Sequence, residues 1–275
     1  MIDINYILPE LFISISLMFI LLIGVFKKNS SLLVYNLTMI SLFILIILLI
    51  NLRSLPSNSF FGSSYLIDEL SNYMKIITVA SGIFVLLTSS KYIKSINIFK
   101  IEYPVLILSS MLGMMVMISS NDLIVFYMGL ELQSLALYVL ASFNRENLLS
   151  SESGLKYFVL SALSSGILLY GCSLVYGFSG STNFNLIADN IINTENGLTF
   201  GIVFILVGLA FKISAVPFHM WAPDVYEGSP TTVTLFFTIV PKIAALTVFI
   251  RFLFVPFLNL IDQWQMIIVF LSIAS

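Results

Sequence analysis

Charged side chains are scarce in this sequence, and their scarcity excludes most classes of soluble protein. Only 9% of the 275 residues are Asp, Glu, Lys or Arg, whereas 59% are hydrophobic. In soluble globular domains roughly a quarter of the residues are charged. The net charge of -2 also argues against a nucleic-acid-binding surface, which needs clustered positive charge. The composition therefore indicates a helical membrane protein that crosses the bilayer many times.

Cysteine and histidine are almost absent, which limits the chemistry that the chain can perform. The single cysteine, Cys172, lies in an apolar run, so it forms neither a disulfide framework nor a Cys-x-x-Cys metal site. We expect it to be a small buried hydrophobic residue. The single histidine is His219. Glycine-rich nucleotide-binding patterns are also absent from the sequence.

Nine apolar segments alternate with short turns, and each has close to the ~20 residues that cross ~30 Å of hydrocarbon. They are Leu8–Val25, Leu32–Leu52, Asn72–Ser89, Tyr103–Ile118, Leu123–Ala141, Lys156–Gly177, Leu198–Met220, Thr231–Phe254 and Leu258 to the end. The longest interruptions, Arg53–Ser71 and Phe178–Gly197, are polar and predict surface loops without a domain boundary. The predicted fold class is an all-α polytopic membrane protein.

The basic residues of the loops predict an orientation in the membrane. The loops after the first, third and fifth segments share one side and hold six basic residues, namely Lys27, Lys28, Lys91, Lys94, Lys100 and Arg145. The opposite loops hold Arg53, with Arg251 at the edge of the eighth segment. By the positive-inside rule, the first side faces the cytoplasm or the mitochondrial matrix, and the amino terminus faces outward.

The stretch Phe211–Pro230, FKISAVPFHMWAPDVYEGSP, places an ionisable group and a helix breaker inside an apolar segment. Lys212 lies within the segment, and Pro217 can neither donate to the carbonyl four residues earlier nor fit that turn without crowding. We expect a helix broken near Ile213–Pro217, with His219 beyond the break on the basic side. Broken helices with ionisable groups build ion sites in transporters. The alternative is a kinked packing helix whose lysine reaches the surface.

Three further charges fall inside apolar segments. Glu131 lies near the middle of the fifth segment, Lys242 at the middle of the eighth, and Lys156 near the start of the sixth. A facing carboxylate favours a charged lysine, whereas burial without a partner favours a neutral one. A lysine whose partner comes and goes would therefore bind and release a proton. The alternatives are that Glu131 is a static counter-ion and that Lys156 extends to the membrane surface.

Weaker patterns accompany these charges. Thr231, Thr234, Thr238 and Lys242 form one helical stripe that predicts a chain of waters, unless the threonines bond their own backbone. In the sixth segment, small residues four apart predict helix-packing faces, namely Ser161 with Ser165 and Ala162 with Gly166. The methionines of the fourth segment also predict helix packing. His219 is either a proton-path residue or a hydrogen-bonded interfacial histidine.

Long motifs identify a family. The runs YMGLELQSLALYVLASF, GLKYFVLSALSSGILLYGCSLVYGFSGSTNF, FKISAVPFHMWAPDVYEGSP and PKIAAL stand in this order. Together they resemble the chain 2 family of respiratory NADH:quinone oxidoreductase (complex I), in the mitochondrial form of plants and protists. These subunits are antiporter-like, with two inverted five-helix repeats that each contain a broken helix with an essential lysine. Residues 1–102 would then be three amino-terminal helices, 103–255 the first repeat and 256–275 the start of a ninth helix.

The resemblance implies proton translocation through Glu131, Lys156, Lys212 and Lys242, and we add His219 as a further candidate from the residues themselves. It implies no cofactor or metal in this chain, with NADH, FMN, iron–sulfur clusters and ubiquinone in partner subunits. Those partners would be other membrane-arm subunits, including antiporter-like chain 4 and the small chain 4L, together with lipids and without nucleic acid. The expected location is the mitochondrial inner membrane, with the bacterial plasma membrane as the alternative.

The sequence departs from the family pattern at its end. The family continues into a second broken helix, whereas this chain stops at Ser275 inside an apolar run. A split gene or a partial sequence is therefore expected. Two other functions remain open, namely a subunit of a multisubunit cation/proton antiporter and a structural membrane scaffold with static ion pairs.

Overall fold

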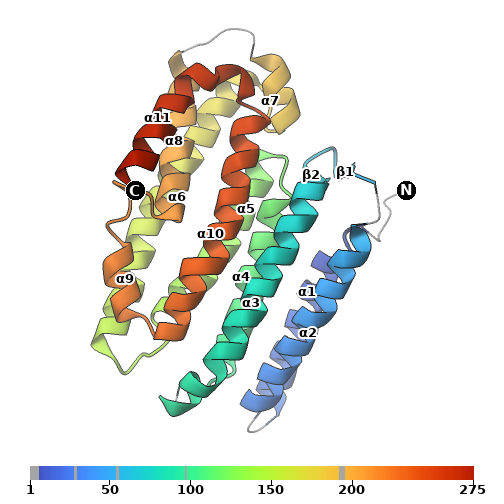
Figure 1. Cartoon of the computed structure of the whole chain (residues 1–275), viewed down its shortest axis with the longest axis vertical. Coiled ribbons are helices and arrows are strands. Elements are labelled where there is room, and N and C mark those ends of the chain that lie inside the picture. Colours follow the sequence, from blue (N-terminus) through green and yellow to red (C-terminus); the bar gives the residue numbers. More distant parts are fainter. Residues whose placement is uncertain (1–5, 28–29, 54–55, 97, 192–195) are drawn as a thin grey trace.

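A computed structural model describes residues 6–27, 30–53, 56–96, 98–191 and 196–275, and most of them are helical (Figure 1). The long helices are α1 (Leu8–Phe26), α2 (Ser31–Leu52), α3 (Glu69–Ser95), α4 (Glu102–Ile118), α5 (Leu123–Ala141), α6 (Leu148–Ser179), α8 (Asn196–Ile213), α10 (Thr231–Phe254) and α11 (Ile261–Ala274). They confirm the nine predicted segments, although the third and sixth are longer than predicted and the seventh is shorter.

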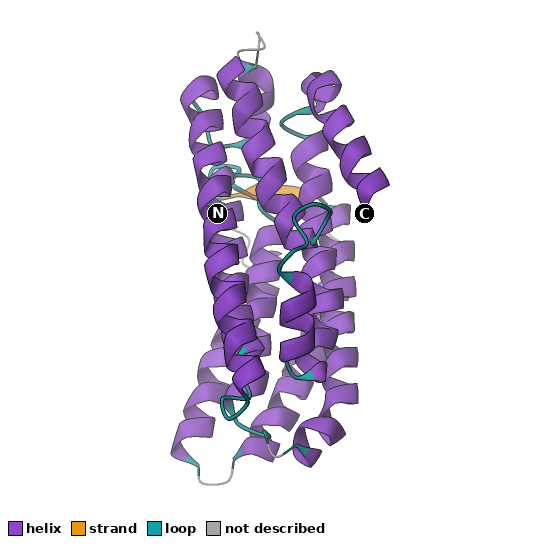
Figure 2. Ribbon diagram, turned by 90° about the vertical axis from the view of Figure 1, so that its left-hand side faces the viewer, coloured by secondary structure: helices purple, strands orange, loops and turns teal. Residues whose placement is uncertain are grey.

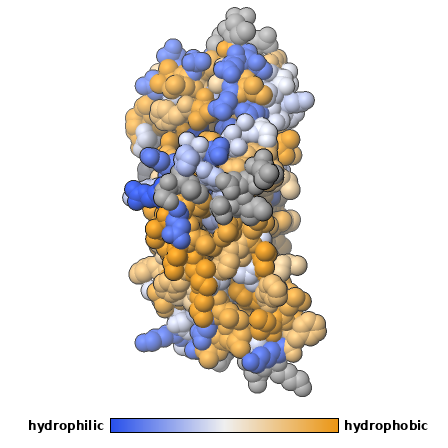
Figure 3. Space-filling model, turned by 90° about the vertical axis from the view of Figure 1, so that its right-hand side faces the viewer, coloured by the Kyte–Doolittle hydropathy of each residue, from blue (hydrophilic) through white to orange (hydrophobic). Residues whose placement is uncertain are grey.

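Six of these helices are long and apolar enough to cross a membrane, and α4, α8 and α11 are shorter apolar helices. On the face shown in Figure 3, hydrophobic residues dominate the lower half, between hydrophilic residues at the bottom and a mixed, more hydrophilic upper half. The connections from α1 to α2, from α3 to α4 and from α5 to α6 lie together at the lower end of Figure 1. The basic loops therefore share one end, as predicted, although Lys28 falls outside the described residues.

The predicted surface loop Arg53–Ser71 contains an antiparallel hairpin of strands β1 (Asn58–Phe60) and β2 (Tyr65–Ile67), seen among the helices in Figure 2. Beyond the hairpin turn, the backbone amide of Leu66 donates to the carbonyl of Ser119 at 2.8 Å, which ties the hairpin to the end of α4. The strands were missed because each has only three residues, too few to show the alternating pattern of a strand.

The second predicted loop, Phe178–Gly197, contains the short helix α7 (Phe184–Asn190), and its residues 192–195 lie outside the described part. Asn183 caps α7, since its side chain accepts from the amide of Asn185 at 3.1 Å. The same side chain donates to the carbonyl of Ser63 in the hairpin turn at 2.9 Å. The two polar interruptions therefore hold each other at the end of the bundle opposite the basic loops.

The predicted roles of methionine and cysteine are confirmed, since the four methionines of α4 are at most 1% exposed and Cys172 is 6% exposed. The predicted packing faces of α6 are only half right. Ser161 and Ser165 are buried, but Ala162 and Gly166 are exposed on the surface of the described chain. The rotation of α6 about its own axis is set by the neighbours that it meets, and sequence spacing does not specify it.

The closest helix approach described for a glycine pair joins α4 to α5, at Gly113 and Gly129. A Cβ atom added to Gly113 would lie 2.5 Å from the backbone nitrogen of Gln133 and 2.8 Å from the carbonyl oxygen of Gly129. Both contacts are with backbone, so a larger residue would force the helices apart. Small residues at helix crossings allow such close packing in membranes.

We predict that Gly113→Ala destabilises the protein by about 1–3 kcal/mol, because overpacking outweighs the gain in helix propensity. Gly166→Ala is the matched control, since an added Cβ there meets no atom within 4 Å. Thermal unfolding of the detergent-solubilised protein would compare the two variants. An equal melting temperature for both would contradict the close α4–α5 contact.

Candidate functional site

Helix α8 ends at Ile213, where the predicted break begins. The backbone of Ser214 turns into the left-handed region with φ of 66°. Its amide donates to the carbonyl of Phe211 at 3.1 Å, and the amide of Ala215 donates to the carbonyl of Ala210 at 2.9 Å. These two bonds form a Schellman motif, which satisfies carbonyls that the end of a helix would otherwise leave unpaired. The predicted interruption of the helix is confirmed.

Trp221 fixes the chain beyond the break. Its indole nitrogen donates to the carbonyl of Phe211 at 3.0 Å, and its ring stacks on Tyr157 with centroids 4.7 Å apart. The chain then enters the short helix α9 (Ala222–Gly228), which has Pro223 in its first turn, where a missing amide proton costs nothing. The tryptophan was not singled out from the sequence, although an indole beside a helix break was the available signal.

Lys212 lies at the last turn of α8 and is 9% exposed. Its ammonium donates to two hydroxyls, Ser134 on α5 at 2.9 Å and Ser161 on α6 at 2.7 Å. The hydroxyl of Tyr138 also donates to Ser161, at 2.8 Å, and the ammonium lies 5.9 Å from the centre of the tyrosine ring. Three helices thus meet at one lysine that is held by neutral groups.

Glu131 lies on α5, one turn before Ser134, and it makes no ion pair within 4.0 Å in the part of the chain that the structure describes. One of its carboxylate oxygens is buried without a hydrogen-bond partner. The expected pairing of Glu131 with a lysine is therefore not a direct ion pair in this structure. Ser134, one turn further along α5, is the residue that contacts the ammonium of Lys212.

Lys156 is placed toward the surface. Its ammonium bridges Glu152 at 2.8 Å and Asp224 of α9 at 2.7 Å, and its side chain is 41% exposed. The reason is that α6 begins at Leu148, so Lys156 is only about two turns from the start of its helix. A cavity of about 130 Å³ lies beside this cluster and is also lined by Glu227. The position of Lys156 therefore agrees with the alternative that its side chain extends to the surface, and not with a deeply buried site.

Lys242 and His219 complete the set of predicted residues. Lys242 is half-buried on α10, with its ammonium 5.5 Å from the ring centre of Tyr226 on α9. His219 is exposed on the segment between α8 and α9. It shares no helical face with Lys212, because α8 ends at Ile213. In the described ranges, His, Cys, Asp and Glu form no group of three that could hold a metal ion.

Of the two interpretations of the threonine stripe of α10, the structure favours hydroxyls that bond to backbone carbonyls over a chain of waters. Thr234 donates to the carbonyl of Tyr226 at 3.0 Å, and Thr238 donates to the carbonyl of Leu235 at 3.0 Å. Thr238 is also exposed on the surface of the described chain. The hydroxyls are thus engaged by backbone, as threonines in membrane helices often are.

Sequence reasoning missed a buried ion pair between α1 and α3. Lys75 is 1% exposed, and its ammonium lies 2.6 Å from the carboxylate of Glu10 and 3.1 Å from the hydroxyl of Tyr65. The signal was present, because Lys75 and Glu10 both fall inside predicted apolar segments. Both were overlooked because each lies only one or two turns from the end of its segment.

A second interhelix ion pair joins Arg251 on α10 to Asp68, the N-cap of α3, at 2.8 Å. Burial raises the pKa of Asp68, but the charge and hydrogen bonds of Arg251, together with hydrogen bonds from Ser71, outweigh it, so the pKa lies below its usual value. The resulting stabilisation is present above the unfolded-state pKa of about 4 and is lost as the pH falls through the lower folded-state pKa.

Comparison with known proteins gives consistent matches. Residues 120–275 match the family model described as NADH:quinone oxidoreductase/Mrp antiporter, TM. The chain is 72% identical over 273 residues to NADH-quinone oxidoreductase subunit N of Pelagibacter ubique, covering 99% of this chain and 58% of that relative. It is therefore similar to a bacterial subunit, and it spans little more than half of that relative's length.

Solved structures show the same fold. A chain of respiratory complex I from Thermus thermophilus with bound aureothin is 28% identical, with a TM-score of 0.77 over 88% of this chain and 52% of that one. A chain of the Mrp complex from Dietzia sp. DQ12-45-1b is 19% identical, with a TM-score of 0.79 over 93% of this chain and 50% of that one. The second likeness concerns the fold alone.

We predict that Lys75→Met destabilises the protein by about 3–5 kcal/mol, because it leaves the Glu10 carboxylate buried without a counter-charge. The double variant Lys75→Met/Glu10→Gln removes both charges and should recover much of that loss. Melting temperatures of the single and double variants would measure the recovery. If the double variant is as unstable as the sum of the two single changes, the charges do not depend on each other.

Proposed function

Because the chain belongs to the NADH:quinone oxidoreductase/Mrp antiporter membrane family, we propose that it translocates protons as a membrane subunit of an NADH:quinone oxidoreductase. The observation that carries this proposal is Lys212, a buried ammonium at a broken helix whose hydrogen-bond partners among the described residues are hydroxyls. A lysine fixed by a direct carboxylate partner would be a static ion pair. A lysine held by neutral groups is poised to change its protonation state.

The arrangement around Lys212 supports a simple cycle. An ionised Glu131 favours the protonated lysine through space, and neutralising Glu131 removes that effect. The lysine would then release its proton through the hydroxyls of Ser161 and Tyr138, which both donate and accept hydrogen bonds. Each hydroxyl would accept one proton and pass on another, so both stay neutral and the proton ends on an acceptor beyond them.

We propose that protons reach this centre from the cytoplasmic end. The cluster of Lys156 and Asp224 lies there beside its cavity, and the exposed His219 precedes the same short helix, α9. The ammonium of Lys242 lies over the ring of Tyr226 on α9. Lys242 would be the next group to receive the proton, or would pass it onward. In this proposal α9 holds the entry groups against the transmembrane lysines.

We also propose how the chain divides into an antiporter-like repeat and its flanking helices. Residues 103–255 would form the first antiporter-like repeat, which carries the proton-handling groups. Residues 1–102, tied together by the Glu10–Lys75 pair, would support it through the Asp68–Arg251 contact, and 256–275 would begin a further helix.

We place the protein in a bacterial plasma membrane, with its amino terminus outward. The relative at 72% identity is bacterial, which favours this location over the mitochondrial inner membrane that the sequence resemblance suggested. The partners would be other membrane-arm subunits, with chains 4 and 4L as the finer proposal. NADH, FMN, iron–sulfur clusters and quinone would act in those partner subunits.

Co-purification distinguishes this function from that of a cation/proton antiporter, whose fold is equally similar. The protein, tagged in its native membrane and purified in mild detergent, should bring down NADH-oxidising activity with flavin and iron–sulfur subunits. Purification with hydrophobic partners alone, free of flavin and iron, would favour the antiporter.

We predict that Lys212→Met lowers proton pumping by about a hundredfold, because the centre loses its protonatable group. The assembled complex should remain, since methionine has a similar length and needs no acceptor. Pumping would be measured in inverted vesicles energised with NADH. Lys91→Met is the control, because Lys91 is exposed at the cytoplasmic end. Equal pumping by the two variants would refute the role of Lys212.

We predict a smaller effect at the entry cluster. Asp224→Asn should slow pumping by roughly two- to fivefold, because an ion pair at the surface contributes little once solvent screens it. The exchanged pair Lys156→Asp/Asp224→Lys should restore part of the rate. Glu146→Gln, which removes another exposed carboxylate at the same end, serves as the control. If Asp224→Asn lowered pumping as much as Lys212→Met does, Asp224 would have a role other than the proposed one at the entry.

A further inference from the structure

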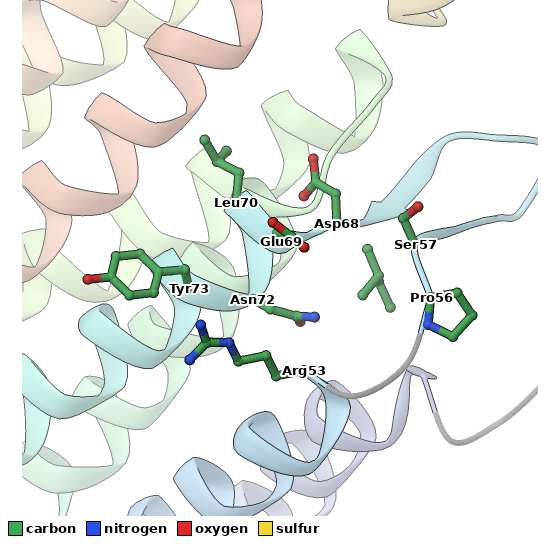
Figure 4. A pocket seen from close by; sticks show the side chains of 9 residues that line it. Arg53, Pro56, Ser57, Asp68, Glu69, Leu70, Asn72 and Tyr73 are labelled. Atoms are coloured by element: carbon green, nitrogen blue, oxygen red, sulfur yellow. The ribbon is translucent and has the colours of Figure 1, made fainter.

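A polar cavity of about 730 Å³ opens at the outer ends of α2 and α3 and takes no part in the proposed proton path (Figure 4). Its lining includes Arg53 at the end of α2, and Asp68, Glu69 and Asn72 at the start of α3. Ligand sites commonly have volumes of about 300–1,000 Å³. The cavity is therefore large enough for a small polar group.

The cavity offers one free positive and one free negative charge. Asp68 is engaged by Arg251. Neither Arg53 nor Glu69 forms an ion pair with any residue in the described ranges, and both are exposed to the cavity. Two unpaired charges of opposite sign in one cavity suit a ligand that itself carries both signs.

Asn72 points independently to a ligand. The residue is 5% exposed, lines the cavity, and has a buried amide oxygen without a hydrogen-bond partner among the described groups. Figure 4 shows its side chain between Arg53 and Pro56. A buried carbonyl oxygen left unpaired is destabilising, and an N–H donor in the cavity would relieve that cost.

The position of the cavity indicates where such a ligand comes from. Helix α2 ends at Leu52 and α3 begins at Glu69, and both helices are long and apolar enough to cross the membrane. Leu70 and Tyr73 line the same cavity and are 36% and 57% exposed. Tyrosine is typical of the boundary between hydrocarbon and headgroups. The cavity therefore lies at the level of the outer headgroups.

We propose that this cavity binds the headgroup of a phospholipid that carries a phosphate and a primary ammonium, as phosphatidylethanolamine does. The phosphate would lie against the guanidinium of Arg53, which binds phosphate oxygens in pairs. The ammonium would donate to the carboxylate of Glu69 and to the unpaired oxygen of Asn72. A choline headgroup has no N–H to donate, and an anionic headgroup without an amine leaves Glu69 unpaired.

Photolabelling tests the site with a phosphatidylethanolamine that carries a diazirine in its acyl chain near the glycerol. The probe would be added to the purified native complex, and labelled peptides would be mapped by mass spectrometry. Label is expected in the peptides that contain Leu70 and Tyr73. Unlabelled phosphatidylethanolamine should compete at least about fivefold better than phosphatidylcholine or phosphatidylglycerol.

Two variants separate the site from general lipid contact. Arg53→Gln and Glu69→Gln should each lower the labelling by about fivefold, whereas Arg145→Gln, at the opposite end, should leave it unchanged. Unchanged melting temperatures would show that the variants remain folded. Equal competition by all three lipids, or labelling that neither variant lowers, would overturn the proposal. The readout requires no NADH oxidation, so it is independent of the proposed function.

Discussion

The cost of an unpartnered charge in hydrocarbon is the constraint on which this structure depends. A charge inside the bilayer must find a partner from another helix, since neither lipid nor water provides one. Lys75 binds Glu10, Arg251 binds Asp68, and Lys212 is held by hydroxyls of α5 and α6. Each of these contacts ties together helices that are distant in sequence, so the few charges also determine how the helices are arranged.

The partners differ in kind, and the difference separates structural from functional charges. The two ion pairs toward the outer end join a base directly to an acid, which fixes both protonation states. Lys212 instead has neutral partners, and Glu131 acts on it without contact. A through-space interaction of this kind changes strength with the charge of Glu131, whereas a direct ion pair resists such a change.

The same constraint applies to the backbone at the end of α8. A helix that stops within the membrane exposes carbonyls, and each of them needs a donor. The Schellman bonds supply two donors, and the indole of Trp221 supplies a third, to Phe211. The stacking of Trp221 on Tyr157 then holds α9 against α6 and brings Asp224 to Lys156. The break, the entry cluster and the lysine centre are therefore one connected arrangement.

The sequence by itself determined the membrane class, the nine long helices of the described residues, which loops share one end and the break after Lys212. These follow from local properties, namely hydrophobic length, the spacing of the loops and the missing amide of proline. Only the tertiary structure decided which groups meet. It placed Ser134 and Ser161 on Lys212, left Glu131 without an ion pair within 4.0 Å among the described residues and left Lys156 near the surface. It also paired Lys75 with Glu10, 65 residues away. Such contacts depend on helix rotation and on neighbours distant in the chain, and no local period encodes them.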